Sequence, residues 1–98
     1  MIRELVHFKL QLGPETDRFR EAQRAVISAM ERIGVQPGTA WFPLTGDDRW
    51  VVMEREFDSL AVYEKDDAAF HGDKEFMRLW REMEGHAETM RVELWQGS

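Results

Sequence analysis

The sequence contains no cysteine, and that absence excludes several kinds of protein at once. Without thiols the chain has no disulfide framework, no zinc–thiolate centre and no cysteine nucleophile. Long apolar runs are absent too. Arg3, Glu4 and His7 interrupt the amino-terminal stretch, so no signal peptide is expected, and no run approaches the about 20 apolar residues of a membrane span. We therefore predict a cytoplasmic protein without a membrane partner.

Positive charge is also scarce. The sequence has 13 lysines and arginines against 19 acidic residues, a net charge of −6, and the basic residues are interleaved with the acidic ones. Such a charge distribution opposes binding to phosphate backbones, so no nucleic-acid partner is predicted. The length of 98 residues suits one domain over 1–98, and a core of that size gains stability from oligomerisation.

Turn and cap residues divide the chain into its elements. Gly13 and Pro14 end the first strand, Thr16 or Asp17 is expected to cap the first helix, and Gly34 is expected to end it. A turn at 46–48 joins two strands as antiparallel neighbours. The predicted strands are 2–12, 39–45, 49–57 and 91–96, and the predicted helices are 17–33 and 60–90, the second interrupted at 71–73, where Asp73 caps its continuation.

This order of strand, helix, strand, strand, helix and strand predicts the ferredoxin-like βαββαβ fold of the α+β class. Right-handed crossovers place the first and third strands in the middle of a four-stranded antiparallel sheet, with both helices on one face.

The third strand carries apolar groups on both of its sides. Val51, Met53 and Phe57 share one side, and Trp50 and Val52 share the other, by the two-residue period of a strand. The chain's own helices can cover only one side. We therefore expect the open sheet face to be covered by a second copy, giving a homodimer.

Three stretches carry a resemblance to a known group of proteins. They are Leu5-Val6-His7-Phe8-Lys9-Leu10, the junction Glu56-Phe57-Asp58-Ser59-Leu60, and Phe70-His71-Gly72-Asp73-Lys74-Glu75-Phe76. In this order, over nearly the whole chain, they resemble the dimeric α/β-barrel superfamily, nearest to its NIPSNAP-like and antibiotic-biosynthesis-monooxygenase-like branches. The resemblance implies that two subunits pair their sheets into a barrel, with ligands held inside it or between sheet and helices. The activities it implies include cofactor-independent oxygenation, haem degradation, isomerisation and decarboxylation.

Haem degradation does not suit this chain. That branch of the superfamily uses an asparagine on the first strand, a tryptophan and an iron-ligating histidine, but this sequence contains no asparagine. His7 stands roughly at the asparagine's place, and Trp80, His71 and His86 match the other positions only loosely. No cofactor is therefore predicted. The three histidines also lack the spacing of a designed metal site, so no metal is predicted.

A catalytic group can be assembled on the open sheet face. His7 would act as a base whose tautomer is fixed by Glu54 or Glu56. Arg91 or Tyr63 would support the developing negative charge. The residues expected to contact a small flat apolar or aromatic ligand are Trp41 and Trp95 on the sheet, and Phe70, His71 and Trp80 at the broken helix.

Each of these residues also has a structural interpretation, and the pattern favours it. His7 and its charged neighbours could form an ion-pair network, His71 could end a helix, and Phe70 could pack in the core. Three functions therefore stay open. The protein is a cofactor-independent monooxygenase or isomerase, a dimeric module that binds a small molecule without chemistry, or an interaction subunit.

Overall fold

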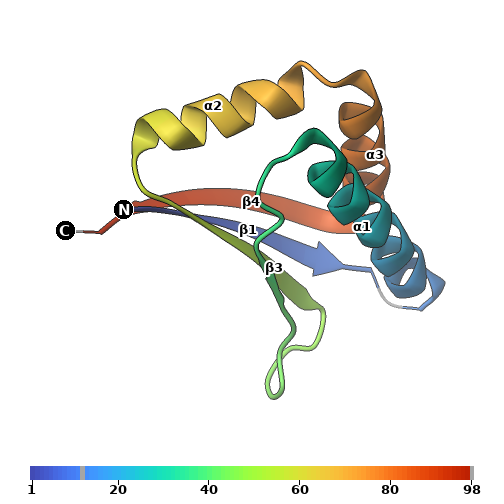
Figure 1. Ribbon diagram of the computed structural model, residues 1–98. Helices are drawn as coiled ribbons and strands as arrows, with labels where there is room; N and C mark the ends of the chain where they lie inside the picture. Colours follow the sequence, from blue (N-terminus) through green and yellow to red (C-terminus); the bar gives the residue numbers. More distant parts are fainter. Residues whose placement is uncertain (12, 98) are drawn as a thin grey trace.

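The computed structural model describes residues 1–11 and 13–97 of the chain (Figure 1). The predicted order of elements is confirmed, with the second helix divided in two. The elements are β1 (Ile2–Leu10), α1 (Pro14–Ile33), β2 (Thr39–Trp41), β3 (Trp50–Phe57), α2 (Leu60–His71), α3 (Lys74–Gly85) and β4 (Ala87–Gln96). No helix among the described residues is long and apolar enough to cross a membrane.

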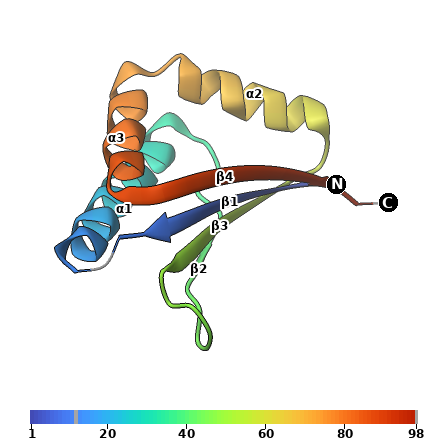
Figure 2. The ribbon, with the colours of Figure 1, turned by 180° about the vertical axis from the view of Figure 1, so that it is seen from behind.

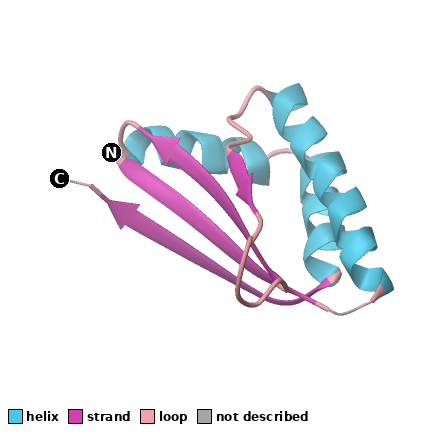
Figure 3. Cartoon of the chain, turned by 90° about the horizontal axis from the view of Figure 1, so that it is seen from below, coloured by secondary structure: helices cyan, strands magenta, loops and turns pink. Residues whose placement is uncertain are grey.

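The described strands form one antiparallel sheet in the order β2-β3-β1-β4, so β1 and β3 are central, as predicted. The described helices α1, α2 and α3 all lie on the same side of this sheet (Figure 2). Figure 3 looks towards the other face. The molecule therefore presents one covered face and one open face, which is the α+β, ferredoxin-like arrangement that the sequence predicts.

The core lies between the covered face and the helices. Along β1, burial alternates residue by residue, which is the mark of a strand with one face packed. Phe8 is fully buried, with its ring centroid 5.0 Å from that of Phe19 on α1 and 5.9 Å from that of Trp80 on α3. Phe76 and Met83 of α3 are buried as well, because α3 is strongly amphipathic.

Several element boundaries differ from the prediction. β2 ends at Trp41 rather than at residue 45, since Pro43 cannot donate to the ladder. β4 begins at Ala87, because Met90 pairs with Phe8 across the sheet instead of continuing the helix. α1 begins at Pro14 without a side-chain cap. The first strand was predicted to reach residue 12, but β1 ends at Leu10, and residue 12 lies outside the described part of the chain.

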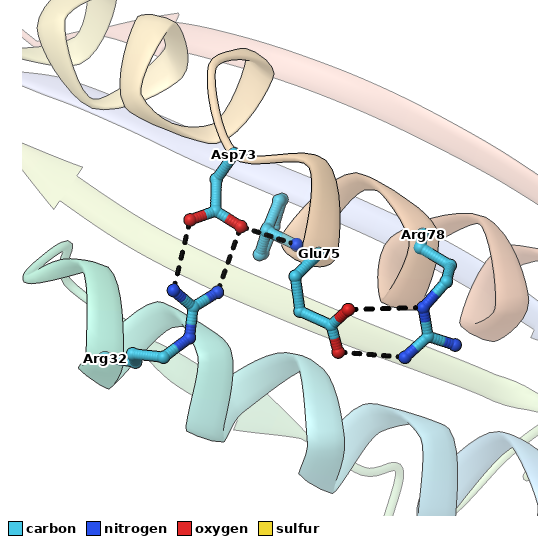
Figure 4. Close-up of polar contacts among 5 residues, drawn as sticks. Arg32, Asp73, Glu75 and Arg78 are labelled. Atoms are coloured by element: carbon cyan, nitrogen blue, oxygen red, sulfur yellow. Dashed lines mark hydrogen bonds and ion pairs between the residues drawn. The ribbon is translucent and has the colours of Figure 1, made fainter.

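The break between α2 and α3 is held by Asp73. Its carboxylate accepts a hydrogen bond of 2.8 Å from the backbone N–H of Phe76, which confirms the predicted cap. The same carboxylate receives two hydrogen bonds, of 3.0 and 3.1 Å, from the Arg32 guanidinium on α1 (Figure 4). These bonds from Arg32 lower the pKa of Asp73. On the next turn Arg78 pairs with Glu75 in the same view. The start of α3 is thus fixed to α1.

Gly38 generates a stability prediction. Its φ of 76° is left-handed, and a Cβ there would overlap the backbone oxygen of Glu54 and lie 2.6 Å from the Cγ of Arg55. We expect Gly38→Ala to lower the free energy of unfolding by about 2–5 kcal/mol, combining backbone strain and overpacking. Gly46 is the control, because it is also left-handed but a Cβ there meets nothing within 4 Å. Gly46→Ala should cost only ~1 kcal/mol in urea denaturation. Equal losses of unfolding free energy in the two variants would contradict the close approach of Gly38 to the backbone of Glu54.

Candidate pocket between the sheet and the helices

A cavity of about 200 Å³ lies between the covered sheet face and the helices. Its apolar wall is formed mainly by aromatic side chains of α2 and α3 and by methionines contributed by helices and strands alike. The Phe70 and Phe76 rings are stacked, with centroids 4.3 Å apart, and Trp80 follows with its centroid 6.0 Å from that of Phe76. Such a wall suits a flat organic molecule.

The other end of the cavity is polar and contains a buried ion pair. Arg55 of β3 is only 4% exposed and Glu4 of β1 only 7%. The Arg55 Nε–H donates to the Glu4 carboxylate at 2.9 Å. The Arg55 guanidinium also sits over the rings of Phe70 and Phe57, 4.6 and 5.0 Å from their centroids. Its Nη1 is buried without a hydrogen-bond partner among the described residues.

Neither residue of this pair was among the site residues predicted from the sequence. The available signal was that Glu4 and Arg55 are the charged residues on the otherwise apolar sides of β1 and β3. The register pairs Glu4 with Arg55 across the two strands, which brings both side chains to the same face. A charged residue on a buried stripe needs a partner, and that requirement would have pointed to the pair.

Tyr63 of α2 also lines the polar end, with its ring edge against Phe57 at a centroid distance of 5.3 Å. Burial raises the pKa of Tyr63 to about 12, and the neighbouring carboxylates of Glu4 and Asp67 add to the effect. Its phenol therefore keeps its proton at neutral pH and can donate a hydrogen bond into the cavity.

His71 lies at the rim of the cavity, in the last turn of α2. Its Nδ1 is 2.8 Å from the backbone carbonyl oxygen of Asp67 and 3.5 Å from the Asp67 carboxylate. A carbonyl oxygen can only accept, so Nδ1 carries the proton in that bond. In the neutral imidazole this leaves Nε2 as the proton acceptor.

The open face holds the other predicted residues. His7 Nε2 lies 2.5 Å from a carboxylate oxygen of Glu93, and Arg91 approaches the same oxygen at 3.5 Å. The structure therefore brings His7 and Arg91 together around Glu93 of β4. Glu54 instead meets Arg3 at 3.3 Å, and Glu56 meets Arg3 at 2.6 Å.

Trp41 and Trp95, predicted to contact a ligand on this face, lie on the edge strands β2 and β4, and the Trp41 indole N–H donates to Glu54 at 3.4 Å. Trp41 is 56% exposed and Trp95 is 57% exposed. Tyr63, Phe70, His71 and Trp80 all line the cavity on the covered side. The predicted site residues thus divide into two groups, separated by the sheet itself.

The described residues contain no group of three or more histidine, aspartate or glutamate side chains placed to hold a metal ion. The cavity offers one guanidinium, one phenol, one imidazole and carboxylates. This set can bind a polar group by hydrogen bonds and exchange a proton with it.

Comparison with known proteins identifies the fold. No family model matches the sequence, and no curated protein matches it significantly. Among solved structures, the chain is similar to a NIPSNAP domain protein from Burkholderia xenovorans, with a TM-score of 0.77, 12% identity, and 100% of this chain and 95% of that chain covered. A NIPSNAP family protein of unknown function from Agrobacterium tumefaciens has a TM-score of 0.77 and 14% identity, with 100% and 88% covered.

A protein described as an antibiotic biosynthesis monooxygenase is also similar, with a TM-score of 0.73, 16% identity, and 100% of this chain and 99% of that chain covered. Identities this low show a shared fold alone. At that level they confirm the predicted resemblance to the NIPSNAP-like and antibiotic-biosynthesis-monooxygenase-like branches.

The environment of Tyr63 generates a titration prediction. Tyr63 is the only tyrosine, so the ultraviolet absorbance of tyrosinate reports on it alone. We expect a midpoint near pH 12 in the folded protein, against 10.0 for the unperturbed group, which urea should restore. The folded state then retains a proton that the unfolded state has released, so stability should fall as the pH rises from 10 towards 12. A folded-state midpoint near 10 would contradict the buried environment.

Proposed function

We propose that this chain forms a homodimer through its open sheet face and binds a small flat organic substrate in the cavity beneath α2 and α3. The reaction it supports there is a cofactor-independent isomerisation or oxygenation that begins with removal of a proton from the substrate.

The observation that carries this proposal is the composition of the cavity. Its volume of about 200 Å³ compares with the about 150 Å³ of an engineered cavity that binds benzene, so it has room for one substituted ring or a small fused pair. Aromatic walls at one end and the buried guanidinium of Arg55 at the other favour a molecule with a ring and a polar group. A largely apolar pocket with a few convergent polar side chains is the usual form of a small-molecule site.

The chemistry follows from two polar side chains, one that can accept a proton and one that can stabilise negative charge. His71 presents Nε2 as an acceptor, since its Nδ1 proton is held by the Asp67 carbonyl. Arg55 remains charged and can stabilise an enolate or phenolate oxygen. In an isomerisation the imidazolium returns the proton to another atom. In an oxygenation the substrate carbanion would reduce dioxygen and form a C–O bond to it, and the peroxide would take the proton back from the imidazolium. Loss of water would then leave a carbonyl group on the substrate, so neither reaction requires a bound cofactor.

The proposed dimer rests on the open face. Leu5, Trp50 and Val52 form a half-buried apolar strip across the centre of that face, and Trp41 beside them is largely exposed. Pairing this face with a second copy removes the strip from water. The His7–Glu93 and Arg3–Glu54 ion pairs would then lie inside the interface, which is the structural role that the sequence pattern favours for them.

Binding without chemistry is the second candidate function, and one observation favours it. His71 sits in the last turn of α2, and its contact with the Asp67 carbonyl is what a helix-ending histidine makes. The side chain of His71 is 65% exposed, so its position alone does not require a catalytic role.

The three histidines provide a matched set of variants to separate these functions. Incubating the protein in D₂O with a ring-fused ketone such as 1-indanone measures proton abstraction directly, as deuterium incorporated at the acidic carbon. We expect His71→Gln to slow enzyme-dependent exchange at least about 100-fold, the usual contribution of a general base. His86→Gln, which changes a contact to Glu15 at the start of α1, should leave exchange within a factor of two.

His7→Gln distinguishes the two faces in the same assay. Loss of deuterium exchange in His7→Gln but not in His71→Gln would place the catalytic site on the open face of the sheet. Binding of the ketone without any exchange would favour the binding module. Native mass spectrometry of the protein from its own host would then identify a retained ligand.

The dimer proposal predicts the effect of a charge in the open face. Val52→Lys places an ammonium group in the proposed interface, and we expect it to raise the dimer dissociation constant at least about 100-fold. Val62→Lys is the control, because Val62 lies on α2, 43% exposed, on the other side of the sheet. Light scattering should give twice the chain mass of 11.6 kDa for the wild type and for Val62→Lys, and the single-chain mass for Val52→Lys. A wild type of single-chain mass would refute the dimer.

A further inference from the structure

The Glu4–Arg55 pair has a consequence for the kind of ligand that the cavity accepts. We infer that it selects an uncharged flat molecule carrying a carbonyl oxygen beside a hydroxyl group, and that it rejects the matching carboxylate. This inference rests on the proposed binding of a flat molecule in the same cavity and adds the chemical class of that molecule.

The demand for an acceptor comes from Arg55. Its Nε is satisfied by Glu4 at 2.9 Å, whereas its Nη1 has no hydrogen-bond partner and lies 4.0 Å from the Asp66 carboxylate. A donor buried in this way carries a substantial desolvation cost. Nη1 itself is closed off from the cavity, but the Arg55 side chain lines it, so a ligand carbonyl can accept a hydrogen bond from the edge of the guanidinium that borders the cavity. The cation–π contacts with Phe57 and Phe70 keep the guanidinium in place, so the donor does not have to be ordered on binding.

The rejection of an anion comes from the balance of charge. Glu4 lines this end of the cavity, Asp66 lies 4.0 Å from Arg55 behind it, and Asp67, 44% exposed, lies at the rim; Arg55 is the one buried cation among the described residues that line the cavity. A ligand carboxylate would add a further negative charge in a place with little water. A protonated His71 at the rim would offset part of this surplus, but its side chain is 65% exposed and solvent screens it.

The preference for a neighbouring hydroxyl comes from the acceptors in the same place. Arg55 Nε occupies one oxygen of Glu4, and the carboxylate has further capacity to accept. Tyr63, whose phenol stays protonated, offers a second donor. A carbonyl flanked by a hydroxyl can therefore accept from Arg55 and donate to Glu4, while its ring lies against Phe76 and Trp80.

Three single-ring probes of similar shape test this inference on the full chain. They are 2′-hydroxyacetophenone, which is neutral with the required pair of groups, salicylate, which is the matching anion, and toluene, which has neither group. Binding is followed by the NMR signal of the Trp80 indole N–H, assigned with Trp80→Phe. We expect the hydroxyketone to bind at least ten-fold more tightly than either salicylate or toluene.

Two variants connect the selectivity to the ion pair. Glu4→Gln removes one negative charge, and it should improve salicylate binding relative to the hydroxyketone at least ten-fold. Glu82→Gln removes a charge from the exposed side of α3 and should leave that ratio unchanged. The double variant Glu4→Gln/Arg55→Met removes the pair without leaving a buried charge, and it should lower the ratio of hydroxyketone to toluene affinity, with Tyr63 as the remaining donor. Circular dichroism establishes that each variant is folded.

The outcomes separate the inference from the proposed function. Equal binding of the three probes to the wild type would overturn the charge selection and keep the pocket. Tightest binding by salicylate, or no change of the ratio in Glu4→Gln, would also overturn it. Binding of none of the probes would overturn the proposed pocket and the inference together.

Discussion

The alternation of side chains along β1 is the constraint on which the rest of the structure depends. β1 lies between β3 and β4, so each of its residues must point either to the helices or to the open face. Val6 and Phe8 pack in the core, and Glu4 is buried beside them because it lies on the same face of β1. His7 is directed to the other side by that same period. A shift of one residue in register would exchange the two rows and dissolve both the core and the cavity.

The main features of the fold could be predicted because they rest on local patterns. Gly34 ends α1 with a φ of 78°, Ser59 and Asp73 cap the two later helices, and the strand order follows from crossover handedness. The predicted element boundaries were wrong where the spacing of apolar residues fitted both a helix and a strand. Met90 continues the helical spacing of Met83, but it also fits a strand. Its pairing with β1 places it in β4. No local signal distinguishes these two choices.

The candidate site was harder to predict, since it depends on pairing across the sheet. The sequence identified the polar residues of the open face, but the register pairs His7 with Arg91 on β4, and its side chain reaches the next acidic residue of that strand, Glu93, rather than Glu54. It also identified Tyr63, Phe70, His71 and Trp80 without showing that they surround one cavity. The buried pair of Glu4 and Arg55 joins residues 51 positions apart in the chain. Such a contact exists only after β1 and β3 have aligned.

The uneven attachment of the helices bears on how a molecule reaches the cavity. α1 buries five residues, and the Arg32–Asp73 pair holds the start of α3 against it. α2 buries only Phe70 and is tied at its two ends, at Ser59 and at the turn around Gly72. Outward swinging of α2 about those ends would separate Phe70 from Phe76 and from the Arg55 guanidinium but would leave the packing of α1 against α3 in place, so such an opening costs less free energy than unfolding the domain. Such an opening would free the Arg55 guanidinium from one of its two aromatic neighbours, while its contact with Phe57 and its bond to Glu4 on β1 would remain.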